Sequence, residues 1–225
     1  MDRRCIINYA DGGWYPRGAA RLYESLTDRF NGEWISYDSN IAPECPVHQV
    51  VPYAFKFWMF QRAKDLGYKN VLWLDASFWA IKSLDDLFTE INDVGYVFQQ
   101  SRHPLGVWCS DVALQKFHIS RESSLKINMH GGGFIGLNFN NGKARVFLNE
   151  MIELSKDGMS FQGSWTNENQ EVSTDKRVKG HRHDMSVGTM LAKRMNMVAV
   201  PEGKYWANFA DHCKYPNVCL LSQGM

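Results

Sequence analysis

The sequence lacks an excess of charge of either sign. Its 25 Lys and Arg residues nearly balance its 24 Asp and Glu residues, which leaves a formal net charge of +1. Proteins that bind nucleic acid usually carry a basic surface, so this balance argues against a nucleic-acid partner. It also gives no general attraction to anionic membranes. Long apolar runs are missing as well, because no stretch reaches the roughly 18 residues that a membrane span needs. We therefore expect no membrane-spanning segment.

Cysteine is scarce and scattered. The five cysteines are odd in number, include no C-x-x-C pair and match no zinc-binding spacing. Unpaired cysteines spread along a chain are typical of a reducing compartment. The first apolar run near the amino terminus is too short for a secretory signal. These absences predict a soluble, cytoplasmic protein.

Strand-like and helix-like patterns alternate along the chain. The expected strands are residues 4–9, 34–37, 71–74, 94–98, 128–138 and 198–200. The expected helices are residues 16–30, 54–66, 84–90, 141–156 and 183–195, while 112–117 could be either and 102–111, 158–180 and the tail from 201 read as irregular. Such alternation predicts an α/β fold with a mostly parallel central sheet and helices on both faces. With 225 residues, 44% of them hydrophobic, we expect a single domain over 1–225, either complete or part of a longer chain.

Asp75 follows four apolar residues, 71–74, that read as a buried strand. In open α/β sheets ligands bind beyond the carboxyl ends of the strands, so a carboxylate at that point is a candidate ligand-binding group. The alternative is that Asp75 only stabilises the turn after the strand, because Asp favours turns.

Three consecutive glycines, Gly131, Gly132 and Gly133, precede an apolar strand sequence. Glycine in a strand costs backbone entropy, so the run predicts a close approach of a ligand to the backbone. A pair of glycines, Gly12 and Gly13, follows Asp11 at the end of the first expected strand. Its spacing is not G-x-G-x-x-G, which disfavours an NAD site and leaves either an anion-binding turn or an ordinary one.

The segment His181-Arg182-His183-Asp184 stands where a helix should begin. Asp184 is well placed as a helix cap, whereas the two histidines suggest a metal site or acid–base chemistry. The segment is similar to the HxHxDH motif of metallo-β-lactamase-type hydrolases, but its aspartate comes one position early and the last histidine is missing.

The order of these motifs resembles that of the GT-A glycosyltransferases, which use nucleotide-sugar donors. The stretch VLWLDAS is similar to their vlylDaD segment, GGGFIGLN to the small-residue strand near the donor sugar, and HRHDMSVGTM to a late helix start. The resemblance covers about residues 3–200. The chain is also similar to transferases that large algal viruses (chlorella viruses) encode to glycosylate capsid proteins, which would place it in the host cytoplasm.

The resemblance implies transfer of a sugar, as by a hexosyltransferase, from a UDP-sugar donor to a hydroxyl of a glycan or glycoprotein acceptor. The implied donor-binding residues are Asp11, Lys56, Asp75, Ser77, Gly131, Gly132 and Gly133. Asp184 is the implied catalytic base or holds sugar hydroxyls, with His183 as second choice.

The resemblance also implies Mn²⁺ or Mg²⁺ bound by Asp75, with His212 as a distant ligand. One departure matters here, since Ser77 occupies the position of the last carboxylate of the family's DxD motif. A serine hydroxyl is a poorer ligand for a hard cation than a carboxylate. Either Asp75 holds the metal with help from elsewhere, or nearby cations share its role.

Two other functions stay open. A nucleotidyltransferase that makes sugar nucleotides would have a glycine-rich loop with Arg and Lys after the first strand, which residues 11–17 match only loosely. A carbohydrate-binding protein without catalysis would fit the eight tryptophans, but the alternation of strands and helices favours an enzyme.

Overall fold

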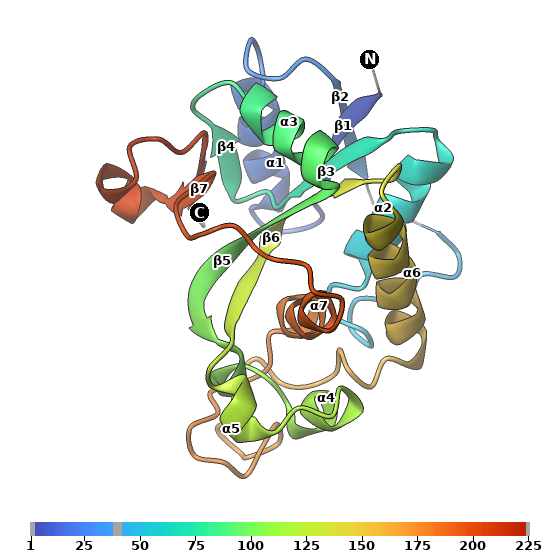
Figure 1. Cartoon of the computed structure of the whole chain (residues 1–225), viewed down its shortest axis with the longest axis vertical. Helices are drawn as coiled ribbons and strands as arrows, with labels where there is room; N and C mark the ends of the chain where they lie inside the picture. The colour runs from blue at the N-terminus through green and yellow to red at the C-terminus, as the bar shows by residue number, and fades with distance from the viewer. Residues whose placement is uncertain (1–2, 38–41, 224–225) are drawn as a thin grey trace.

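A five-stranded sheet forms the centre of the computed structural model, which describes residues 3–37 and 42–223 (Figure 1). Its strand order is β2-β1-β3-β6-β5. The strands are β1 (Arg4–Tyr9), β2 (Glu33–Tyr37), β3 (Asn70–Leu74), β5 (Tyr96–Pro104) and β6 (Asn128–Asn138). β6 pairs antiparallel with both β3 and β5, while β1 pairs parallel with β2 and β3. All strands but β6 thus point the same way, and the predicted mostly parallel sheet is confirmed.

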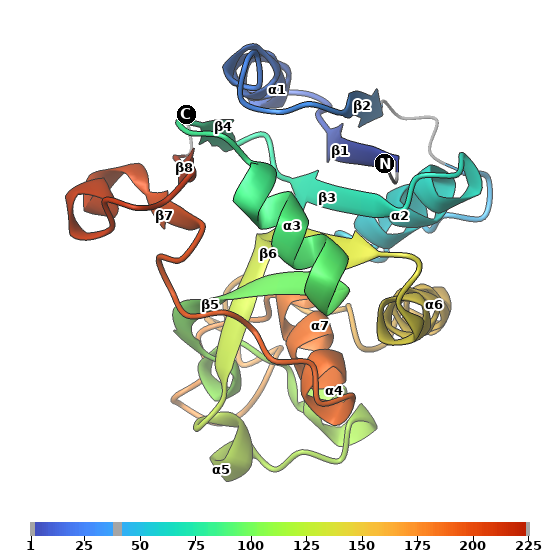
Figure 2. The same ribbon diagram turned by 45° about the horizontal axis from the view of Figure 1, so that its top comes forward.

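Helices cover both faces of this sheet, as predicted (Figure 2). One face carries α2 (Phe55–Asp65), α6 (Gly142–Asp157) and α7 (His183–Arg194); the other carries α1 (Tyr15–Ser25) and α3 (Asp85–Val94). Successive side chains of a strand point to opposite faces, so Val71 and Trp73 pack in the first layer and Leu72 and Leu74 in the second. None of the helices in the described residues is long and apolar enough to cross a membrane.

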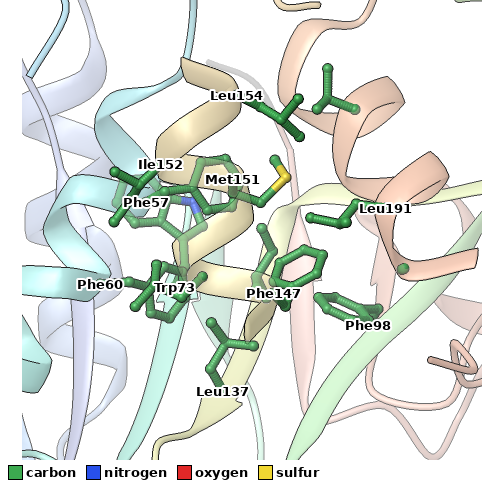
Figure 3. Packing of buried hydrophobic residues seen from close by; sticks show 14 of the residues in the cluster. Phe57, Phe60, Trp73, Phe98, Leu137, Phe147, Met151, Ile152, Leu154 and Leu191 are labelled. Carbon is green, nitrogen blue, oxygen red and sulfur yellow. The ribbon is translucent and has the colours of Figure 1, made fainter. Parts of the chain in front are cut away.

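Aromatic side chains, together with Leu, Ile and Met, fill the layer between the sheet and helices α2, α6 and α7 (Figure 3). Phe57 from α2 contacts Phe147 from α6 edge to face, with ring centroids 6.3 Å apart. Phe147 in turn lies against Phe98 of β5 at 5.1 Å. All three are fully buried. Leu191 of α7 belongs to the same cluster. The cluster thus holds α2 and α7, which carry Lys56 and Asp184, against the sheet.

A second, three-stranded sheet forms where an irregular tail was expected. β4 (Phe78–Ala80) pairs antiparallel with β8 (Leu220–Ser222), and β8 pairs parallel with β7 (Trp206–Asn208). A 3₁₀ helix, η2 (Phe209–Lys214), lies between β7 and β8 in the chain. The prediction of an irregular tail was wrong because strands of three residues are too short to show an alternating pattern.

The strand predicted at 198–200 was also wrong. Val198 is 77% exposed, and only Val200 makes a ladder contact, a single parallel bridge to Gln99. The ambiguous stretch 112–117 is helical, as α4 (Asp111–Lys116), with the Ser110 side chain accepting a hydrogen bond from the Ala113 N–H as its cap. Two further short elements were not predicted, η1 (Leu105–Val107) and α5 (Arg121–Ser124).

The long segment between α6 and α7 contains no helix or strand, as predicted, but one side chain organises it. The Asn167 amide donates to the carbonyls of Ser173 (2.8 Å) and Val178 (3.2 Å). Its oxygen accepts the N–H groups of Val172 (3.0 Å) and Ser173 (3.1 Å). This segment leads the chain directly into the start of α7.

Candidate functional site

Asp75 lies at the carboxyl end of β3, next to the glycine run of β6. Its N–H donates to the Gly133 carbonyl at 3.0 Å, which continues the sheet one residue past β3. A Cβ on Gly133 would lie 2.7 Å from the Asp75 Oδ2 atom. The carboxylate therefore needs glycine at that position in order to lie against the strand.

Lys56 joins this carboxylate to the start of α7. Its Nζ lies 3.2 Å from Asp75 Oδ1 and 2.9 Å from Asp184 Oδ2, and donates to the Gly132 carbonyl at 2.8 Å. The Lys56 side chain is only 3% exposed. Four residues that were each expected at the site thus come together around one buried ammonium group, although they lie on three elements and a turn.

The electrostatics of this group follow from its burial. Burial alone would lower the pKa of Lys56, but the carboxylates of Asp184 and Asp75 more than offset that effect and raise it. Burial raises the pKa of Asp184, while Lys56 opposes the change. A buried charge is tolerated when it is paired and hydrogen-bonded, which this arrangement provides.

The two carboxylates differ in what they can reach. The Asp75 side chain is 39% exposed and that of Asp184 is 6% exposed. Asp75 Oδ1 also accepts a hydrogen bond from Trp73 Nε1 at 2.6 Å, so this oxygen is fully engaged by the protein. Asp75 can therefore meet a ligand, and Asp184 supports the group from behind.

The other two glycines are needed for close packing as well. A Cβ on Gly132 would lie 2.7 Å from Asp184 Oδ2 and 2.6 Å from Met185 Cγ. A Cβ on Gly131 would lie 2.9 Å from the Trp206 ring. The glycine run was predicted to let a ligand approach the backbone closely. In the structure the atoms nearest to the three glycines belong to protein side chains, of which Asp75, Met185 and Trp206 line the glycine-side cavity.

Two cavities meet at Asp75 and Ser77. The first, of about 430 Å³, lies at the end of β1 and is here called the β1-side cavity. The second, of about 380 Å³, contains Gly131, Gly132 and Gly133 and is called the glycine-side cavity. Because Asp75 lines both, one extended ligand could pass it from one cavity into the other. A larger hollow of about 610 Å³ lies at the opposite end of the strands, and its charged residues pair in the bridges Arg3–Glu33 and Arg4–Asp85.

The β1-side cavity is rich in aromatic rings. Asp11 lines it and accepts a hydrogen bond from the Tyr9 hydroxyl at 3.2 Å. Trp14 and Tyr15 stack on each other there, with centroids 4.5 Å apart. Aromatic faces beside a hydrogen-bonding carboxylate are suited to holding a base and a sugar ring.

Ser77 is held by its neighbours. Its hydroxyl lies 3.1 Å from the Ser222 hydroxyl of β8, and its carbonyl accepts from Arg21 at 2.9 Å. The small second sheet thus fixes the turn that follows Asp75.

His181 and His183 anchor the preceding segment to the start of α7. His181 donates from Nε2 to the Ser160 carbonyl (3.0 Å) and accepts the Ser110 N–H at Nδ1 (3.2 Å). His183 donates from Nδ1 to the Phe161 carbonyl at 2.8 Å. Burial lowers the pKa of His181 to about 3 and that of His183 to about 4, so both are neutral at pH 7. Neither ring is among the residues that line the two cavities.

His212 lies outside both cavities. Its ring stacks on Phe209 with centroids 5.4 Å apart, and its Nδ1 donates to the Phe209 carbonyl at 2.8 Å. Its neighbour Asp211 does line the glycine-side cavity, paired with Lys214.

The described residues contain no group of three His, Cys, Asp or Glu side chains placed to hold a metal ion. Asp75 offers one exposed carboxylate, and the adjoining Ser77 offers a hydroxyl. Magnesium-type ions are commonly held by one or two carboxylates together with substrate phosphates. The donor set therefore fits an ion that is bound jointly with a phosphate ligand, and does not fit one held by the protein alone.

Most residues that line the glycine-side cavity were not predicted site residues, among them Arg182, Trp206 and Asp211. Arg182 and Asp211 are direct neighbours of residues that were singled out, so their segments carried the signal. Trp206 lies on a three-residue strand, β7, which is too short to show an alternating pattern.

No protein-family model matches the sequence, and no curated protein matches it in sequence. The fold, in contrast, is similar to several solved structures. One is a glycosyltransferase involved in the glycosylation of the major capsid of PBCV-1, with a TM-score of 0.58 and 10% identity over 98% of this chain and 93% of that one. Mouse xyloside xylosyltransferase 1 is similar with a TM-score of 0.55 and 11% sequence identity, over 100% of this chain and 98% of that one. The bifunctional glycosyltransferase WbbM is similar with a TM-score of 0.59 and 10% sequence identity, over 100% of this chain and 46% of that one.

The likeness to the first two structures spans almost the whole of each chain. At identities this low it establishes the arrangement of the elements, and it agrees with the sheet and the two helical layers described above. The GT-A glycosyltransferase fold predicted from the motif order is therefore confirmed.

Proposed function

We propose that this protein is a glycosyltransferase that moves a sugar from a nucleotide-diphosphate donor, a UDP-sugar, to a hydroxyl of a glycan or glycoprotein. The observation that carries the proposal is the position of Asp75. It is the partly exposed member of a buried ion-pair group and lies where two cavities meet at the carboxyl ends of β1 and β3. Ligands of open α/β sheets bind at that edge.

In this proposal the β1-side cavity takes the nucleoside. Trp14 and Tyr15 provide ring surfaces for the base, and the Asp11 carboxylate accepts hydrogen bonds from hydroxyl or N–H groups. The sugar lies over Gly131, Gly132 and Gly133, and the acceptor enters the glycine-side cavity. The diphosphate then lies beside Asp75, between the two cavities.

The charges beside Asp75 determine whether the diphosphate needs an additional cation. The diphosphate and Asp75 are both anionic, and the ammonium group of Lys56 beside Asp75 is already paired. A divalent ion, Mn²⁺ or Mg²⁺, bound to Asp75 together with the donor would neutralise charge that develops on the leaving diphosphate. His212 remains a proposed additional ligand.

We assign Asp184 a positioning role within this reaction. It is buried, lies against Gly132 and holds Lys56, which in turn holds Asp75 and the Gly132 carbonyl. Such a group keeps the sugar-binding strand and the diphosphate-binding carboxylate in fixed register. His183, hydrogen-bonded to the Phe161 carbonyl, positions the start of the same helix.

The test compares the thermal stability of the protein with UDP, with Mn²⁺ and with both. We expect stabilisation by the pair, little effect of Mn²⁺ alone, and a much smaller effect of the pair on Asp75→Asn. Asp86→Asn, an exposed carboxylate on α3, serves as matched control and should behave as wild type. With a UDP-sugar that is turned over, Asp75→Asn should lower the rate by about 100-fold or more, as expected for loss of a group that organises transition-state charge.

A carbohydrate-binding protein without catalysis would respond to free sugars and not to UDP. Stabilisation by sugars alone, or an unchanged UDP and Mn²⁺ effect in Asp75→Asn, would overturn the proposal.

A further inference from the structure

The glycine-side cavity contains a positively charged group that the transfer reaction above does not use. Arg182, the residue before α7, lies between two indole rings, with its guanidinium carbon 3.8 Å from the Trp108 centroid and 4.0 Å from that of Trp165. Its Nη1 donates to the Trp165 carbonyl at 2.8 Å. Stacking on both faces fixes the plane of the guanidinium and leaves its other N–H groups without a carboxylate partner among the described residues.

Two further basic side chains lie near it. His103 lines the cavity and contacts Trp108 edge to face at 5.9 Å. The Lys179 N–H donates to the Val107 carbonyl at 2.9 Å and the Arg182 N–H to the adjoining Trp108 carbonyl at 3.1 Å, which brings both basic residues to the Trp108 side of the cavity. Burial, and then the charges of Arg182 and Lys179, lower the pKa of His103. Lys179 is exposed and, within the part of the chain that the structure describes, forms no ion pair.

The acidic groups of the cavity are already engaged. Glu202 pairs with Arg102 at 2.7 Å, Asp211 with Lys214, and Asp75 with Lys56 at 3.2 Å. Arg182 and Lys179 therefore keep their positive charge free for a ligand. Repulsion between neighbouring like charges makes an anion the ligand that this corner stabilises best.

We propose that the glycine-side cavity binds an acceptor saccharide that carries an anionic group, a carboxylate or a phosphate, and that Arg182 and Lys179 hold this group. The proposal rests on the proposed function and adds the chemical class of the acceptor. A guanidinium held flat recognises a carboxylate or phosphate through two parallel hydrogen bonds. The Trp206 ring, packed on Gly131 in the same cavity, offers an apolar face to the sugar itself.

The cluster belongs to the acceptor side and not to the donor diphosphate. Arg182 and His103 line the glycine-side cavity and are absent from the lining of the β1-side cavity. The nucleotide is expected in the β1-side cavity, with its diphosphate at Asp75. An anion bound by Arg182 would therefore belong to a ligand in the glycine-side cavity.

The experiment measures binding of matched sugars to the UDP-loaded protein by isothermal titration calorimetry. Methyl β-glucuronide and methyl β-glucoside differ only in a carboxylate at carbon 6, and glucose 6-phosphate is the phosphate probe. We expect at least one anionic probe to bind about 10-fold or more tightly than the glucoside, the factor that one charged hydrogen bond supplies. The stronger of the two anionic probes identifies the group that is recognised.

Arg182→Gln should abolish this preference, and Lys179→Gln, an exposed change that tests the idea without risk to folding, should reduce it. Arg194→Gln removes the same charge at the other end of α7, where Arg194 pairs with Glu150, and should leave the preference intact. Added NaCl should weaken the preference in the wild type.

Equal affinity for charged and neutral probes in the wild type would overturn the inference, as would a preference that survives both Arg182→Gln and Lys179→Gln. If Arg182→Gln instead weakens UDP binding and leaves the ratio between probes unchanged, the cluster serves the donor and the inference fails. If the wild-type protein does not bind UDP at all, the proposed function itself fails. This outcome is distinct from failure of the inference about the acceptor.

Discussion

At the scale of single residues, the site depends on one ammonium group that has three partners. Replacing a buried ion pair by apolar groups can be neutral, but removal of one partner leaves an uncompensated charge inside the protein. Lys56 is the shared partner of both carboxylates, whereas each carboxylate touches only part of the group. The close contacts around it leave no room for additional atoms on the neighbouring strand.

Gly132→Ala tests this closeness. The new methyl group would lie within 2.7 Å of Asp184 Oδ2 and 2.6 Å of Met185 Cγ, so α7 must shift and the Lys56 contacts must change. We expect a loss of about 1–3 kcal/mol in the free energy of unfolding, typical of overpacking, together with loss of UDP binding. Urea denaturation and thermal shift with UDP measure the two effects.

Gly142→Ala is the matched control. Its methyl group would meet nothing closer than 3.9 Å, and the position begins α6, where alanine is preferred to glycine. We expect unchanged or slightly higher stability. If both variants behaved alike, the contacts of Gly132 would not matter for the site.

At the scale of elements, the segment between α6 and α7 is a long irregular stretch that one amide keeps in place. The hydrogen bonds of Asn167 close a loop that ends at Val178, and Trp165, one of the two rings that hold Arg182, lies two residues before Asn167. Order in this segment therefore bears on the shape of the glycine-side cavity, which Trp165 and Arg182 line.

Asn167→Ala should loosen the segment, because the N–H groups of Val172 and Ser173 lose their acceptor. We expect faster amide hydrogen exchange across residues 164–179 and a weaker preference for anionic sugars, with UDP binding retained. Hydrogen exchange followed by mass spectrometry measures the first effect. Asn169→Ala, which removes an exposed side chain with a single 3.4 Å contact to Glu171, should leave exchange unchanged. Equal exchange in both variants would contradict the role given to Asn167.

Elements also differ in how well the sequence predicts them. Strands β1, β3 and β6 and helices α2, α6 and α7 were expected within a few residues of their bounds, because each has enough length to show its period. The strands of the second sheet, three residues each, exist through pairing with distant partners and have no period to read. The same holds at the site. Asp75 and the glycine run were found because they interrupt a pattern, whereas the stacking of Arg182 between Trp108 and Trp165 depends on tertiary contacts alone.

At the scale of the whole molecule, three buried histidines predict how stability depends on pH. Burial lowers the pKa of His130 to about 4, that of His181 to about 3 and that of His183 to about 4, each from an ordinary value near 6.5. The folded state therefore binds fewer protons than the unfolded state below pH 6.5. The stabilisation is fully present above that value and is lost as the pH falls towards the folded-state pKa values.

We expect the urea midpoint to fall steeply between pH 7 and pH 5.5. At one pH unit below the ordinary pKa, each histidine costs about 1.4 kcal/mol, so the three together cost roughly 4 kcal/mol. NMR titration should find all three rings neutral at pH 5.5. An equal midpoint at both pH values, or protonation of these rings above pH 6, would contradict the expectation.

The contact between Lys56 and Asp184 joins positions 128 residues apart in the chain. Loops of that span close late in folding, because their entropy must be overcome before the contact forms. During synthesis, a chain that has not yet added α7 has Lys56 and Asp75 but lacks the carboxylate that completes the group. If the protein binds a nucleotide donor as proposed, that binding should be absent from every intermediate until α7 docks, so that nucleotide binding would report the docking of this helix.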